Sequence, residues 1–156
     1  MEIYMTISFA GHAFICSGNS VKELVKEQIE NNIDGEESVV CFLGGYGQFD
    51  DICAYACKEL KQKYSKIQLV YVTPYISLSE QAKISEMKKQ GMYDEVLYPP
   101  IEKVPLKFAI SKRNNWMVEN SDLVIAYVNH SFGGAYKTLQ AAKRKKKRII
   151  NICDFV

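Results

Sequence analysis

Short apolar segments alternate with amphipathic helix patterns along the chain, and this alternation constrains the fold more than any other feature. Apolar runs at residues 3–9, 38–43 and 67–72 are each followed by a helical pattern. Similar runs recur at residues 123–128 and 148–153. Strands that are apolar on both faces are typical of parallel sheets covered by helices on both sides. The pattern therefore predicts an α/β fold, namely a Rossmann-like three-layer sandwich with a mostly parallel sheet flanked by helices on both faces.

Helix boundaries follow from capping signals and apolar stripes. Ser20 and Glu23 form a capping-box pattern that predicts the start of the first helix. Ser77 and Glu80 form a second such pattern before a helix at about residues 79–90, and Gly91 predicts its end. Further helices are expected at residues 49–64, 106–119 and 134–146, and a short strand is expected within residues 93–98.

Size and charge narrow the class of protein. A chain of 156 residues fits one domain, which we expect to span residues 1–156. No early apolar run has a basic flank and a cleavage site, and no run is long enough to cross a bilayer, so we expect a cytoplasmic protein without membrane contact. The net charge of +2 argues against a nucleic-acid partner. The sequence leaves open whether the protein forms a homo-oligomer.

Two side-chain groups have competing interpretations. Cys53 and Cys57 are spaced to present two metal ligands on one helical face. They also fall within an apolar helical stripe, where free cysteine behaves as a small core hydrophobe, and we therefore expect neither a metal nor a cofactor. The basic tract at residues 143–148 could contact nucleic acid. It lies at a predicted helix end, where cations complement the dipole, and a solvated face is the favoured interpretation.

Glycine turns follow two of the predicted strands. In parallel sheets, ligands bind beyond the carboxyl ends of the strands. The turn at residues 44–47 leads into a helix with Asp50 in its first turn, an arrangement suited to phosphate. A tight turn with Asp50 as the helix N-cap is the alternative. Gly133 and Gly134 repeat the arrangement after the run at residues 123–128.

Two further polar candidates, Arg113 and Asn114, lie on the predicted helix that leads into the run at residues 123–128. Arg113 could bind a phosphate through two parallel hydrogen bonds, although a surface position is the favoured interpretation for an isolated arginine. Asn114 could bind a hydroxyl or a base edge. The candidate ligand-binding residues are Gly11, His12, Gly44, Gly45, Tyr46, Gly47, Asp50, Thr73, Arg113, Asn114, Ser131, Gly133 and Gly134, and the candidate catalytic residues are Asp50 and Asp51.

Several of these motifs resemble the YpsA-type branch of the SLOG superfamily. The similar segments include the motif around Gly11, Gly44-Gly45 with Asp50, the run SKRNNWMV at residues 111–118, and GGAYKT at residues 133–138. The resemblance runs from about residue 6 to residue 152. Ala13 and Gln48 stand where the family pattern has arginine and glycine.

The resemblance implies a Rossmann-like sheet that binds nucleotides or nucleotide-derived signals in a sensory or regulatory role. The superfamily also contains the LOG phosphoribohydrolases and the DNA-processing protein DprA. The LOG resemblance implies an alternative, hydrolysis of the N-glycosidic bond of a nucleoside 5′-monophosphate, and it would align the LOG glutamate with Asp51. Such cleavage needs a carboxylate beside the reacting carbon. A protein-interaction module is a second alternative.

Overall fold

The protein contains a six-stranded sheet in which every strand pairing is parallel. The computed structural model describes residues 4–35 and 37–156. The strand order is β4-β3-β2-β1-β5-β6. The mostly parallel sheet expected from the sequence is therefore wholly parallel over the described residues. The strands are β1 (Tyr4–Gly11), β2 (Ser38–Leu43), β3 (Ile67–Val72), β4 (Glu95–Leu97), β5 (Leu123–Tyr127) and β6 (Arg148–Asn151).

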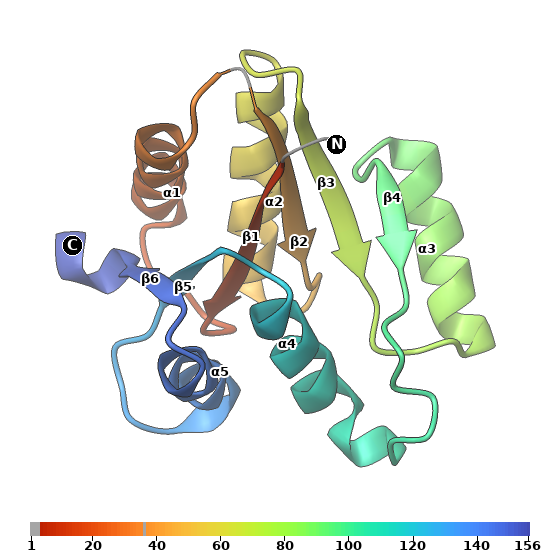
Figure 1. The fold of residues 1–156 in the computed structure, drawn as a ribbon. Helices are drawn as coiled ribbons and strands as arrows, with labels where there is room; N and C mark the ends of the chain where they lie inside the picture. The colour runs from red at the N-terminus through yellow and green to blue at the C-terminus, as the bar shows by residue number, and fades with distance from the viewer. Residues whose placement is uncertain (1–3, 36) are drawn as a thin grey trace.

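Helices cover both faces of the sheet, as the sequence predicts. Helices α1 and α2 contact each other, and α4 and α5 contact each other in a separate layer (Figure 1). None of the helices in the described part of the chain is long and apolar enough to cross a membrane. The helices are α1 (Gly18–Asn32), α2 (Gln48–Lys61), α3 (Leu78–Gln90), α4 (Ala109–Glu119) and α5 (Gly133–Arg144), with 3-10 helices at Leu106–Phe108 and Ile152–Phe155.

Element boundaries differ from the sequence expectations at both ends of the chain. Helix α1 begins at Gly18, so Ser20 lies inside the helix and the predicted cap at Ser20 is wrong. The predicted strand start at residue 3 lies outside the described residues. Strand β6 ends at Asn151 because the side chain of Asn151 accepts a hydrogen bond from the backbone N–H of Cys153 and starts a 3-10 helix.

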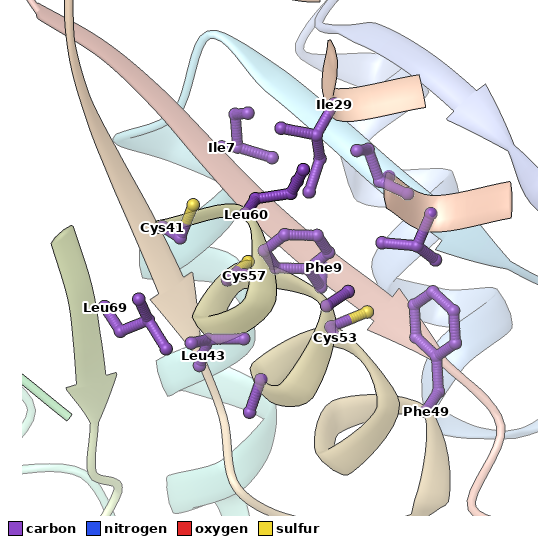
Figure 2. Packing of buried hydrophobic residues seen from close by; sticks show 14 of the residues in the cluster. Ile7, Phe9, Ile29, Cys41, Leu43, Phe49, Cys53, Cys57, Leu60 and Leu69 are labelled. Carbon is purple, nitrogen blue, oxygen red and sulfur yellow. The ribbon is translucent and has the colours of Figure 1, made fainter. Parts of the chain in front are cut away.

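The main core lies between the sheet and the α1–α2 layer. Phe49, Cys53 and Cys57 of α2 are wholly buried there (Figure 2). Burial raises the pKa of the Cys53 thiol well above its ordinary value. Both cysteines therefore occupy core positions, as the apolar stripe predicts. In the basic tract, Lys145 forms an ion pair with Glu119 at a distance of 3.3 Å.

Strand β1 lies where the strand order of the sheet changes direction. The chain adds β2, β3 and β4 on one side of β1 and then returns to place β5 on the other side. Ser8 of β1 is aligned with Phe42 of β2 and with Val124 of β5. A crevice therefore opens beyond the carboxyl ends of β1, β2 and β5, where the connecting helices diverge.

Candidate functional site

A cavity of about 570 Å³ occupies this crevice. Its walls come from the end of β1 and the loop after it, the turn that starts α2, the first half of α4, the end of β5 with the loop after it, and the first turns of α5. The lining residues are Phe9, Ala10, Gly11, His12, Ala13, Phe14, Cys16, Tyr46, Asp50, Ile110, Arg113, Asn114, Tyr127, Asn129, His130, Gly133, Gly134, Ala135 and Thr138.

Arg113 forms one wall of the cavity and is almost fully buried. Its Nη1 donates hydrogen bonds to the carbonyl oxygens of Gly44, at 2.8 Å, and Val72, at 2.7 Å. Its Nε donates to Oδ1 of Asn114 at 2.9 Å. Arg113 thus joins α4 to the carboxyl ends of β2 and β3, and the surface position considered from the sequence is wrong. No described group accepts a hydrogen bond from its Nη2.

The first glycine turn is filled by the protein's own side chains. A Cβ on Gly44 would lie 3.1 Å from Nη2 of Arg113. Gly45 has a φ of 69°, and a Cβ there would lie 2.7 Å from Cε1 of Tyr71. The backbone N–H of Tyr46 already donates to Oδ2 of Asp50, at 2.9 Å. The glycines of this turn therefore admit neighbouring protein atoms, and Gly44, Gly45 and Gly47 do not line the cavity.

Helix α2 begins at Gln48, so Asp50 lies inside its first turn. Gly47 is the N-cap residue of this helix. The N-cap position considered for Asp50 is therefore wrong, although its carboxylate still accepts a hydrogen bond from the residue before the cap. The backbone N–H of Gln48 donates to the carbonyl oxygen of Ala13, and the side chain of Gln48 accepts from the N–H of Ile15. Gln48 thus fixes the loop after β1 against α2.

The second glycine turn is open. A Cβ added to Gly133 or Gly134 would meet no atom within 4 Å. The N-cap residue of α5, Phe132, makes no side-chain capping bond, and the first turn contains no acidic residue. No described group outside the helix accepts from the N–H groups of residues 133–135. Such unpaired N–H groups at a positive helix end form an anion site.

Three stacked rings lie beside the second turn. The imidazoles of His12 and His130 are stacked, with centroids 3.7 Å apart, and His130 stacks on Phe132 at 4.1 Å. Nε2 of His12 accepts a hydrogen bond from the backbone N–H of Asn129 at 3.1 Å. Burial, followed by the neighbouring His130, lowers the pKa of His12. A neutral His12 therefore connects the loop after β1 to the loop after β5.

Asp50 is the carboxylate of the cavity wall. Burial raises its pKa to about 6, against the smaller opposing effects of the Tyr46 N–H and the Arg113 guanidinium. Asp51 has an exposed side chain and does not line the cavity. Partial desolvation raises the pKa of Asp51, and the nearby charge of Lys83 opposes this. Of the two candidate catalytic carboxylates, only Asp50 is thus placed to contact a ligand in the cavity.

We predict that Asp50→Asn stabilises the protein at neutral pH. A carboxyl whose pKa is raised by folding loses stability as pH rises from its unfolded value, 3.8, to its folded value of about 6. The amide is not subject to this loss, so the variant should be more stable by about 3 kcal/mol at pH 7.5. The difference in stability between Asp50→Asn and wild type should shrink as the pH falls to about 4. Urea unfolding at both pH values checks this, with exposed Glu102→Gln as the control.

The cavity gathers many, but not all, of the residues selected from the sequence. Thr73 is buried elsewhere, where its hydroxyl pairs with the backbone of Tyr75. Ser131 is exposed outside the lining. Phe14 and Asn129 also line the cavity and were not among these candidates. Asn129 directly follows the apolar run at residues 123–128, whereas Phe14 lies in the loop after β1. The selected residues that the cavity brings together are Gly11, His12, Tyr46, Asp50, Arg113, Asn114, Gly133 and Gly134.

Residues 17–154 match the YpsA family model, described as the YspA SLOG family. The chain belongs to this family. A comparison with curated proteins found no significant match. The matched range includes both glycine turns and Arg113, and family membership suggests a ligand derived from a nucleotide.

Two solved structures of DNA processing protein A share the fold of this SLOG-family chain. The Streptococcus pneumoniae protein has a TM-score of 0.65 and 16% identity, over 94% of this chain and 49% of that chain. The Helicobacter pylori protein, described for its binding of single-stranded DNA, has a TM-score of 0.61 and 18% identity, over 93% of this chain and 63% of that chain. The chain thus spans less than two thirds of either protein, and the likeness is one of fold.

Proposed function

We propose that this SLOG-family protein binds a nucleotide or nucleotide-derived small molecule in the cavity, in a sensory or regulatory role. The observation that carries the proposal is the open, uncapped N-terminus of α5, which faces a cavity with a buried arginine in its wall. A phosphate group at Gly133 and Gly134 would accept hydrogen bonds from the unpaired N–H groups of the helix. In the first glycine turn, by contrast, the backbone N–H of Tyr46 is already bonded to Asp50 and is not free for a phosphate. This turn therefore supports the cavity wall instead.

The remaining walls suit the rest of such a ligand. A volume of about 570 Å³ lies in the range of pockets that enclose small organic ligands. Asp50 and Asn114 supply oxygen and amide groups that can bind ribose hydroxyls. The ring of His12 provides a flat surface on which an uncharged group can pack. Arg113 compensates negative charge through its Nη2.

The test is a charge change at the open helix end. Gly134→Asp should fold, because its side chain enters open space and an acid favours a helix N-terminus. The new carboxylate would occupy the anion site and repel phosphate. We expect affinity for ADP-ribose and AMP, measured by calorimetry, to fall at least about tenfold relative to wild type, which is the loss of one charge-assisted contact.

Gly134→Asn is the matched control, since it adds a side chain of the same size and shape without charge. It should retain most of the affinity. Equal binding by wild type and Gly134→Asp would exclude the α5 N-terminus as the phosphate site. If neither nucleoside phosphates nor ADP-ribose-like compounds bind the folded wild type, the binding proposal itself fails and the protein-interaction alternative gains support.

A second candidate function is hydrolysis of the N-glycosidic bond of a nucleoside 5′-monophosphate. The observation that favours it is Asp50, a cavity carboxylate whose pKa of about 6 allows proton transfer near neutral pH. Release of free base from AMP by the wild type, and its loss in Asp50→Asn, would support this activity. Release that persists in Asp50→Asn would exclude Asp50 as the acid or base.

A further inference from the structure

Helix α3 buries one residue among its thirteen, and that residue is an acid. Glu80 is only 5% exposed. A carboxylate removed from water is costly unless hydrogen bonds replace its hydration. Here each oxygen has a tyrosine partner: Tyr71 donates to Oε1 at 2.6 Å, and Tyr46 donates to Oε2 at 3.0 Å. The buried acid is thus placed to hold two hydroxyl groups.

Tyr46 is held at both of its ends. Its backbone N–H donates to Asp50, and its hydroxyl donates to Glu80. Between these points, Nζ of Lys83 lies 4.1 Å from the ring centroid, and Cζ of Arg113 lies 5.6 Å from it. Cations at such distances are attracted to an aromatic ring. Of this group, Tyr46, Asp50 and Arg113 line the cavity, while Glu80 and Lys83 do not.

We infer that Glu80 is a positioning residue of the candidate site, which fixes the ring of Tyr46 in the cavity wall without contacting the ligand. The inference rests on the proposed function, because it concerns the same cavity. The competing role for Glu80 is purely structural, in which it attaches α3 to β3 through Tyr71. The two roles differ in whether the effect of Glu80 on binding passes through the Tyr46 hydroxyl.

A double-mutant cycle separates the two roles. Glu80→Gln, Tyr46→Phe and the double variant are compared with wild type for binding of ADP-ribose and AMP by calorimetry. Glu86→Gln is the matched control, since it makes the same change at an exposed position of α3. We expect Glu80→Gln to weaken binding about tenfold, as for one hydrogen bond to a charged group. In the Tyr46→Phe background, its further effect should be less than about twofold. An equal loss in both backgrounds would overturn the inference.

A ligand-free measurement keeps this inference distinct from the proposed function. Burial, and then the hydrogen bond to Glu80, raises the pKa of Tyr46 to about 12. With ¹³C-labelled tyrosine, the Tyr46 signal is assigned as the one lost in Tyr46→Phe. Its titration midpoint should move toward the ordinary tyrosine range in Glu80→Gln and stay unchanged in Glu86→Gln.

The outcomes point to different conclusions. If wild type binds neither probe, the proposed function fails, and the titration alone decides whether Glu80 positions Tyr46. An unchanged titration in Glu80→Gln overturns the inference, as does unchanged affinity in a wild-type background that binds. If Glu80→Gln does not fold, Tyr46→Phe removes the same hydrogen bond while leaving Glu80 and Tyr71 paired, and its full affinity would likewise overturn the inference.

Discussion

An Arg113→Met protein is expected to lose about 3 kcal/mol of its free energy of unfolding, because the carbonyl oxygens of Gly44 and Val72 lose their buried donor. Loss of the desolvation cost of the cation offsets part of this penalty. Methionine keeps most of the volume, so the change acts mainly through hydrogen bonding and charge. Affinity for ADP-ribose or AMP should fall about 100-fold, since the cavity also loses its buried cation.

The neighbouring Lys112→Met serves as the control, because Lys112 is exposed on the same helix. It should change neither the urea midpoint nor the affinity. Arg113→Lys should recover little of the stability or affinity that Arg113→Met loses, because an ammonium group cannot reproduce the planar set of donors. If Arg113→Met unfolds at the same urea concentration as wild type, the link between α4 and the strand ends contributes nothing to stability.

Gly11→Ala is expected to destabilise the protein by about 3 kcal/mol through overpacking. Gly11 ends β1, and a Cβ there would lie 2.2 Å from Cδ2 and 2.3 Å from Cγ of Phe49. Phe49 is wholly buried in the core, so its ring has no free space into which to move. Relief would require a shift of α2 away from β1. Thermal unfolding should show a decrease of roughly 10 °C in Tm.

Gly134→Ala makes the same chemical change in open space and is the matched control. Its Tm should lie within about 2 °C of the wild-type value, as for surface substitutions that meet no neighbour. A similar loss of stability in both variants would mean that Phe49 does not limit the space at Gly11.

The fold was largely predictable because its strands are marked by their own composition. The bounds of β2 and β3 agree with the apolar runs at residues 38–43 and 67–72. The start of α1 was mispredicted, because Ser17 adopts the cap position with a φ of 57° and makes no side-chain capping bond. A helix that starts without a side-chain cap leaves no capping pattern in the sequence. Ser20 and Glu23 match a capping box, although no helix begins at Ser20.

The site was less predictable, because its contacts depend on the partners that tertiary structure supplies. The two glycine turns look alike in sequence, yet Gly45 is packed against Tyr71 while Gly134 faces open space. Only the positions of distant side chains distinguish them. The pattern at Ser77 and Glu80 predicts a reciprocal cap, and Ser77 does accept from the N–H of Glu80. The carboxylate of Glu80 turns instead to two tyrosines, which no local pattern indicates.

The return of the chain to β1 has a consequence for the order of folding. Pairing of β1 with β5 joins residues 116 positions apart, such as Ile7 and Leu123. Closing so long a loop is entropically costly, and parallel pairings of high sequence separation form slowly. Strands β1, β2 and β3 pair within a far shorter stretch of chain. The cavity, which needs the loops after both β1 and β5, should therefore assemble late, after much of the α1–α2 core has formed.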